Sequence, residues 1–260
     1  PLIPSVNTKF VLANNLDLRL SYARGFRSPS LRELYFNFFD ANHQILGNPG
    51  LKAETSHSIN GSLTWKKVSA DEVVYSTILG GFYNNVKNLI DYALDANNPN
   101  IFILTNVANS KTAGATLSTS IKHKQWNISL GAAYTGFYND YSVTDDALPQ
   151  LQWSAEINSA ISYKFSKIGL DANLFYKFTG KRPYYAVNTN QDIVLTEQQG
   201  YHTGDLTLNK KLFKYFSLNT GIRNLFDVTR VNSSYAGGGT HGSNGIRNIA
   251  NGRSYFAGLL

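Results

Sequence analysis

Apolar and polar residues alternate along much of the chain with a period of two. Between residues 16 and 23, apolar side chains occupy every second position, and the positions between them are mostly polar. The alternation recurs at residues 58–65, 126–135, 153–164 and 168–178. This period is typical of β-strands that are apolar on one face only. The pattern predicts an all-β protein built from antiparallel strands.

The alternation predicts eleven strands, joined in turn by short and long connections. The expected strands cover residues 2–12, 16–24, 53–65, 72–92, 101–121, 126–138, 152–164, 168–179, 201–211, 216–226 and 251–260. Short turns are expected near residues 14–15, 66–71, 122–125, 166–167 and 212–215. Long connections are expected at residues 25–52, 93–100, 139–151, 180–200 and 227–250. Short turns on one side and long loops on the other are typical of outer-membrane β-barrels.

The composition favours a membrane barrel over a soluble β-sandwich, which has the same alternation. Aromatic residues make up 13% of the chain and charged residues only 16%, against about 25% charged in soluble domains. Amphipathic aromatic side chains gather at both interfaces of a membrane. Those beside the short turns are Trp65, Trp126, Phe165, Phe213 and Phe216, and those towards the long loops are Tyr134, Phe137, Tyr176 and Phe178. The sequence therefore predicts a transmembrane antiparallel β-barrel.

Basic residues concentrate at the short turns. Nine of the 24 Lys and Arg lie there, namely Lys66, Lys67, Lys122, Lys124, Lys164, Lys167, Lys210, Lys211 and Lys214. Such side chains can reach the anionic headgroups at one membrane interface, so lipids and lipopolysaccharide are expected partners. A nucleic-acid-binding protein would concentrate its charge in one groove or stripe, and no nucleic-acid partner is expected.

Eleven strands do not close into a single-chain barrel. The first and last expected strands both run towards the short-turn side, whereas bacterial single-chain barrels have an even number of antiparallel strands. We therefore expect further strands before Pro1, and we interpret the chain as a fragment.

Two segments resemble the paired boxes of TonB-dependent outer-membrane receptors. The first runs from Tyr22 to Tyr35 and contains Phe26, Arg27, Pro29 and Glu33; the second runs from Gly47 to Thr55 and contains Asn48, Pro49, Leu51 and Glu54. Ser28 and Ala53 stand where the family usually has Ala and Pro. Residues 82–90, 224–227 and 252–256 resemble further family signatures.

This resemblance implies a barrel of 22 strands in the bacterial outer membrane, of which this chain would be the C-terminal half. It also implies an N-terminal plug domain and a partnership with the TonB–ExbB–ExbD system through the missing N-terminal region. A surface lipoprotein is a further possible partner. The implied activity is active import of a large, scarce nutrient. We expect Asn48, Pro49 and Glu54 to shape the loop rather than to contact the ligand.

The paired boxes are especially similar to those of haem receptors, in which a histidine between the boxes coordinates the iron. His43 occupies that place, and Phe36 and Phe39 lie near it in the sequence. A neutral imidazole is a good axial ligand for haem iron, so His43 is the candidate metal ligand. The alternative is an exposed loop histidine. His241, in a glycine-rich stretch, is a second candidate. Haem would be a transported ligand and not a permanently bound cofactor.

Other ligands and other protein classes remain as alternatives. Cobalamin is the second candidate ligand, and Tyr184, Tyr185 and Tyr201 could contact either cobalamin or haem. A ferric siderophore or a peptide is a further alternative. A passive porin would share the barrel but lack the paired boxes. An outer-membrane enzyme would need a nucleophile with a partnered base, and no such motif is found, so an enzyme is not expected.

Overall fold

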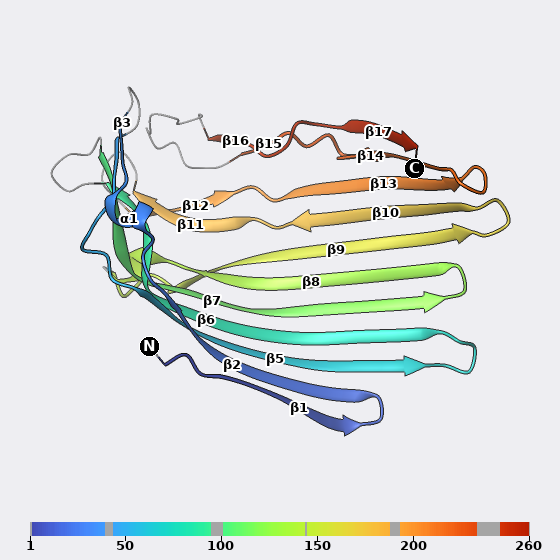
Figure 1. The fold of residues 1–260 in the computed structure, drawn as a ribbon, viewed down its shortest axis with the longest axis horizontal. Coiled ribbons are helices and arrows are strands. Elements are labelled where there is room, and N and C mark those ends of the chain that lie inside the picture. Colours follow the sequence, from blue (N-terminus) through green and yellow to red (C-terminus); the bar gives the residue numbers. More distant parts are fainter. Residues whose placement is uncertain are drawn as a thin grey trace.

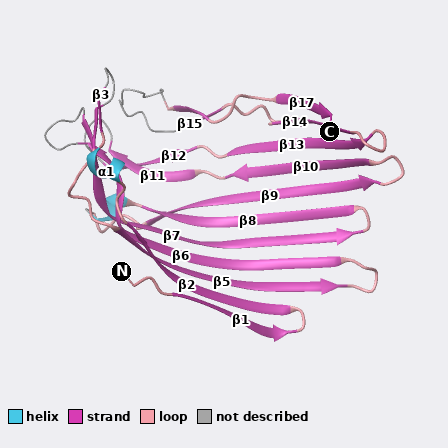
Figure 2. Ribbon diagram, viewed as in Figure 1, coloured by secondary structure: helices cyan, strands magenta, loops and turns pink. Residues whose placement is uncertain are grey.

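The computed structural model describes residues 2–39, 44–94, 101–143, 145–187, 193–232 and 245–259. Most of these residues lie in one antiparallel sheet whose strands run side by side from β1 at one edge to β17 at the other (Figure 1). The short turns lie at one end of the sheet and the long connections at the other. Figure 2 shows how little helix accompanies the strands. The all-β prediction is confirmed.

All eleven expected strands are present in the sheet. In spatial order they are β1 (Ser5–Ala13), β2 (Leu16–Arg27), β5 (Glu54–Val68), β6 (Val74–Leu94), β7 (Ile101–His123), β8 (Trp126–Tyr138), β9 (Leu151–Phe165), β10 (Leu170–Thr179), β13 (Tyr201–Lys211), β14 (Ser217–Arg223) and β17 (Ser254–Leu259). Each strand pairs antiparallel with the next one along this path. The sheet therefore follows chain order, as the short turns and long loops predict.

The long connections contain short elements that the alternation does not predict. They are α1 (Leu31–Tyr35), β3 (Asn37–Phe39), β4 (Gln44–Leu46), the 3-10 helix η1 (Asp140–Val143), β11 (Arg182–Val187), β12 (Ile193–Gln198), β15 (Arg230–Asn232) and β16 (Ile246–Asn248). Three-residue strands are too short to display a period. β4 pairs with β3 and also lies parallel to the start of β7. No helix in the described ranges is long and apolar enough to cross a membrane.

The strand register forms one continuous apolar face. A row of paired residues crosses seven strands as Leu18, Leu63, Leu79, Leu117, Ala132, Ile157 and Phe178. Among the described residues, only Ile90, Leu104 and Val231 are buried apolar side chains. A soluble sandwich would cover its apolar face with a second sheet. A wide exposed apolar face on single strands instead matches the lipid-facing surface of a barrel.

The opposite face is polar, and it includes one aromatic residue whose placement the alternation leaves ambiguous. In residues 72–83 both faces are apolar by sequence. The register places Leu79 and Tyr83 on the lipid-facing side and Phe82 on the other, opposite Gly114. A Cβ at Gly114 would lie 2.7 Å from the Cζ atom of Phe82. The missing side chain at Gly114 thus makes room for the Phe82 ring on the polar face.

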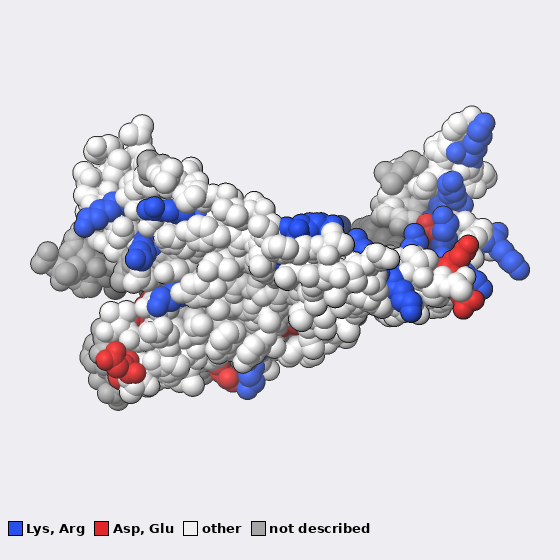
Figure 3. Space-filling view, turned by 90° about the horizontal axis from the view of Figure 1, so that it is seen from below, with Lys and Arg blue, Asp and Glu red and all other residues white. Residues whose placement is uncertain are grey.

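Aromatic side chains mark both ends of the lipid-facing surface. Near the short turns, the Tyr163 ring lies 4.5 Å from those of Trp126 and Phe165, measured between centroids. Towards the loops, Tyr134 stacks on Trp153 at 4.9 Å. Lys and Arg gather at the short-turn end, at the right of Figure 3; others lie at the loop end, and fewer charged residues lie between the two ends. This arrangement matches two aromatic belts flanking an apolar band.

A lysine at the middle of the apolar band tests which face contacts lipid. Leu130 lies four positions from both Trp126 and Tyr134, and its neighbour Ser129 lies on the polar face. We expect Leu130→Lys to lower the free energy of unfolding in lipid vesicles by about 2–4 kcal/mol, because a lysine at the bilayer midplane is poorly solvated. Ser129→Lys should cost less than about 1 kcal/mol. Denaturant titration followed by intrinsic fluorescence measures both, and equal losses would contradict the assignment of faces.

Candidate functional site

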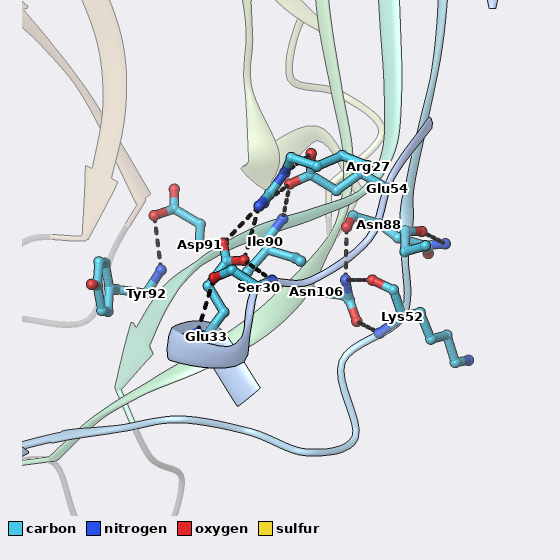
Figure 4. Close-up of polar contacts among 11 residues, drawn as sticks. Arg27, Ser30, Glu33, Lys52, Glu54, Asn88, Ile90, Asp91, Tyr92 and Asn106 are labelled. Carbon is cyan, nitrogen blue, oxygen red and sulfur yellow. Dashed lines mark hydrogen bonds and ion pairs between the residues drawn. The ribbon is translucent and has the colours of Figure 1, made fainter. Parts of the chain in front are cut away.

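The paired boxes meet at the loop end of the sheet around the guanidinium of Arg27 (Figure 4). Arg27 lies at the end of β2. Its Nε and Nη2 atoms donate to the two carboxylate oxygens of Glu54, at 2.8 and 2.6 Å. Its Nη1 atom donates to both oxygens of Glu33, at 2.9 Å each. Arg27, Glu33 and Glu54 are hereafter the rim clamp. It joins β2, α1 and β5 through one charged, forked side chain.

Glu33 also fixes the start of α1. The backbone N–H of Ser30 donates to Glu33 Oε2 at 2.7 Å, and the backbone N–H of Glu33 donates to Ser30 Oγ at 3.2 Å. This reciprocal pair is a capping box, which satisfies two N–H groups that a helix start leaves free. The same carboxylate thus caps the helix and pairs with Arg27. The first box therefore encodes both the helix and its attachment to the sheet.

Glu54 is the most shielded member of the rim clamp. Its side chain is 12% exposed, against 45% for Arg27. The backbone N–H of Ile90 on β6 donates to Glu54 Oε1 at 2.8 Å. Glu54 lies five residues beyond Ile59, which pairs with Tyr22 and Tyr83, and so about 16 Å outside the loop-side aromatic level at the rise of a strand. The rim clamp is therefore outside the membrane-spanning part of the sheet.

Hydrogen bonding lowers the pKa of both carboxyl groups in the rim clamp. The pKa of Glu33 is lowered chiefly by the backbone N–H of Ser30 and further by Arg27. The pKa of Glu54 is lowered chiefly by its hydrogen bonds from Arg27 and further by the backbone N–H of Ile90. The two carboxylates in turn raise the pKa of Arg27. All three groups are therefore held in their charged forms.

The second box is bound to β7 and to α1. Asn48 Nδ2 donates to the carbonyl of Leu104 at 3.0 Å, and Asn48 Oδ1 accepts from the backbone N–H of Gly50 at 2.8 Å. Gly47 donates to the carbonyl of Phe36 at 2.8 Å. A Cβ at Gly47 would lie 2.9 Å from the backbone carbonyl carbon of Leu34, so glycine allows this close approach.

Asn106 of β7 holds the residues just before β5 in the same way. Its side chain exchanges hydrogen bonds with the backbone of Lys52, at 2.7 and 2.9 Å, and donates to the carbonyl of Asn88 at 2.7 Å. Asn88 has a positive φ of 56°, a conformation that asparagine tolerates better than most residues. The connection between β2 and β5 is thus held by hydrogen bonds to β5, β6 and β7.

The structure brings only some of the residues singled out in the two boxes into contact. Phe26 is 40% exposed on β2, and Pro29, Pro49 and Leu51 lie in the segments that lead into and out of the loop. None of these four residues belongs to the rim clamp.

The aromatic residues beside α1 form a partly exposed group. The rings of Phe36 and Phe38 stack with centroids 6.3 Å apart, and the Arg32 guanidinium lies 5.0 Å from the Phe36 centroid. Phe39, at the end of β3, is 59% exposed. His43 and His241 lie outside the described residues.

Tyr184 and Tyr185 line a cleft at the loop ends of β8 and β9. The cleft has a volume of about 160 Å³. This cleft is hereafter called the aromatic cleft. It is lined by Phe137, Tyr138, Asn139, Asp140, Tyr141, Gln152, Arg182, Pro183, Tyr184 and Tyr185. Burial raises the pKa of Asp140, and the nearby charge of Asp91 raises it further. Sequence reasoning missed Asp140, Gln152 and Arg182, because they come from three separate segments with no shared motif.

Removing the arginine of the rim clamp tests its structural role. Arg27→Ala leaves Glu33 and Glu54 without their shared cation, and we expect the local stability of α1 to fall by about 1–2 kcal/mol. Amide hydrogen exchange of residues 31–36 should then accelerate by about 5- to 30-fold. Lys9→Ala, which breaks the more exposed Lys9–Asp17 pair, is the matched control and should change exchange little. Unchanged exchange in Arg27→Ala would contradict the attachment of α1 by Arg27.

The lowered carboxyl pKa values predict an acid-sensitive rim clamp. In the folded clamp, the pKa values of Glu33 and Glu54 are lowered from the ordinary value of 4.5. The opened state therefore binds more protons near that pH. The stabilisation is therefore complete above the ordinary pKa and is lost as the pH falls through the lowered values. Exchange protection of α1, corrected for intrinsic rates, should be constant between about pH 5 and 7 and should decline below that range. The double variant Glu33→Gln, Glu54→Gln should lack this decline; an equal decline would assign it to other groups.

Short stretches of the chain are similar to haemoglobin-binding proteins. A stretch of 78 residues is 40% identical to the hemoglobin and hemoglobin-haptoglobin-binding protein C of Haemophilus influenzae, covering 30% of this chain and 7% of that protein. A stretch of 76 residues is 40% identical to the hemoglobin and hemoglobin-haptoglobin-binding protein B of Haemophilus influenzae, covering 29% of this chain and 7% of that protein.

Solved iron-uptake receptors share the fold over nearly the whole chain. The siderophore receptor PirA of Acinetobacter baumannii has a TM-score of 0.71 and 20% identity, covering 99% of this chain. The FrpB iron transporter of Neisseria meningitidis has a TM-score of 0.71 and 15% identity, covering 100%. A ferric enterobactin receptor mutant of Pseudomonas aeruginosa has a TM-score of 0.67 and 21% identity, covering 99%.

The chain spans about two fifths of the solved receptors that it resembles, between 39% and 40% of their lengths. At these identities the likeness concerns the fold. The family itself is shown by the sequence, because residues 2–225 fit the model described as TonB dependent receptor-like, beta-barrel. This chain therefore belongs to the β-barrel family of TonB-dependent outer-membrane receptors.

Proposed function

We propose that this chain is part of a receptor that imports haem across the bacterial outer membrane with energy supplied through TonB. The observation that carries the proposal is the 40% identity over 78 residues to a protein named for binding haemoglobin. The paired boxes add to it, because His43 lies between them and a neutral imidazole is a suitable axial ligand for haem iron.

The rim clamp supports this proposal by anchoring the excursion that carries His43. β3 and β4, which flank residues 40–43 in the sequence, lie between the two boxes, and β4 pairs with the start of β7. Phe36 and Phe39 present partly exposed rings in the same excursion. Aromatic faces can pack on a flat porphyrin. In this proposal the boxes position the ligand-binding segment and do not themselves contact haem.

The partners of such a receptor follow from its activity. Import against a gradient requires the TonB–ExbB–ExbD system, which would act through the N-terminal region. Lipids and lipopolysaccharide would surround the apolar band, and a surface lipoprotein could deliver the ligand to the loops. Haem would be cargo, with no permanently bound cofactor. His241 and the tyrosines Tyr184 and Tyr185 are further candidates for ligand contact.

Titration of the detergent-solubilised full-length receptor with haemin tests the proposal. We expect a saturable Soret shift, and His43→Ala should weaken haemin binding by about 10- to 100-fold through loss of an axial ligand. His123→Gln, at the short-turn end of β7, is the control and should bind haemin normally. Cobalamin is titrated in parallel. Tight cobalamin binding without a specific haem response would overturn the haem assignment, and unchanged affinity in His43→Ala would remove His43 as the ligand.

A further inference from the structure

The aromatic cleft adjoins a larger cavity on the polar face of the sheet. This cavity has a volume of about 500 Å³ and is lined by residues of β8, β9, β10, β11, β12, β13 and β16. Phe137 and Arg182 line both the cleft and the cavity. A ligand with a bulky body and a small polar group could therefore occupy both spaces, with Arg182 at their junction. Cavities of several hundred Å³ are the usual size of small-molecule sites.

Among the described residues, Arg182 is a cation that forms no ion pair. Its guanidinium lies 4.4 Å from the centroid of the Phe137 ring. Stacking against a ring leaves the N–H groups at the guanidinium edge free to bind an oxyanion. Within the described ranges, no carboxylate lies within ion-pair distance of Arg182, whereas its neighbour Lys181 pairs with Glu197 at 2.8 Å. Arg182 is thus the cation available to a ligand in the cleft.

A second side-chain donor lines the same cleft as Arg182. The Nε2 atom of Gln152 is buried and has no hydrogen-bond partner among the residues that the structure describes. Gln152 pairs with Phe137 across β8 and β9, so both side chains project from the same, polar face of the sheet. A buried amide donor left unpaired costs free energy, and an acceptor atom on a ligand would remove that cost. Two donors therefore line the same cleft.

Asp140 sets the charge balance of the cleft. It is the acidic residue among the cleft-lining side chains, and the carboxylate of Asp91 is the charged neighbour that, together with burial, raises its pKa. A negative Asp140 opposes an anionic ligand, while Arg182 favours it. The two residues should therefore affect the affinity for an anion in opposite directions.

We infer that Arg182 and Gln152 bind an ionised carboxylate at the edge of a flat aromatic ligand whose ring system occupies the adjoining cavity. The cleft supplies the aromatic walls of Phe137, Tyr184 and Tyr185, and it is too small for a tetrapyrrole. The inference rests on the proposed function where the ligand is haem, whose propionate groups supply the carboxylate. It names a contact at the wall of the sheet, separate from the iron ligand His43.

Esterified porphyrins isolate the carboxylate contact. The full-length receptor is titrated with haemin, with haemin dimethyl ester and with metal-free protoporphyrin. We expect wild type to bind the acids about tenfold more tightly than the ester, and Arg182→Gln to lose that preference. Asp140→Asn should bind the acids about threefold more tightly, because a like charge is removed. Neither substitution should change the affinity for the ester. Lys181→Gln removes the neighbouring cation outside the cleft and is the matched control.

The outcomes separate this inference from the haem assignment. Haemin binding that depends on His43 but does not distinguish acid from ester would overturn the carboxylate site and leave haem import standing. Binding of protoporphyrin that depends on Arg182, with no specific haemin response, would support the carboxylate site and overturn the haem assignment. Binding of neither acid would overturn both. Equal effects of Arg182→Gln and Lys181→Gln would reduce the site to non-specific attraction.

Discussion

The need to pair every backbone N–H and C=O group within the membrane governs this structure. Lipid offers these groups no hydrogen-bond partners, so a spanning chain must satisfy them internally. Here antiparallel pairing joins each of the eleven long strands to its neighbour in the sheet. That pairing leaves the side chains free to divide between two faces, one apolar and one polar. The absence of a large buried core within the described residues follows from this division.

This constraint no longer applies at the loop end of the sheet, because water and charged side chains there can bind backbone N–H and C=O groups. Beyond the aromatic belt the chain leaves the regular ladder and forms α1 and the short hairpins. These elements are too small to be stable alone. The rim clamp compensates by binding α1 to β2 and β5 through charge-assisted hydrogen bonds. The hydrogen bonds of the two boxes thus hold the long connection between β2 and β5 in a fixed position.

The aromatic cleft lies on the polar face, at the loop end of the sheet. The Arg182 guanidinium lies over the Phe137 ring, and Gln152 pairs with Phe137 across β8 and β9. Gln152 lies on β9 beside Trp153, at the loop-side aromatic level, and Arg182 begins β11 in the connection that follows β10. Both residues therefore lie at the loop end of the sheet. The rim clamp pairs its charges internally, whereas in the described part of the chain the cleft has a cation without an ion pair and an amide donor without a hydrogen bond. This difference separates a group that stabilises the fold from one suited to binding.

The sequence by itself determined the strands and the apolar face, because a period of two is a local property that each segment carries alone. It also indicated the family, because the two boxes lie within short stretches of chain. The sequence left the face of Phe82 open, since both faces are apolar there, and cross-strand register decided it. It gave no sign that Asp140, Gln152 and Arg182 meet in one cleft. Only the tertiary structure decided that, because the three residues come from different connections and strands, and their proximity depends on how the loops fold back onto the sheet.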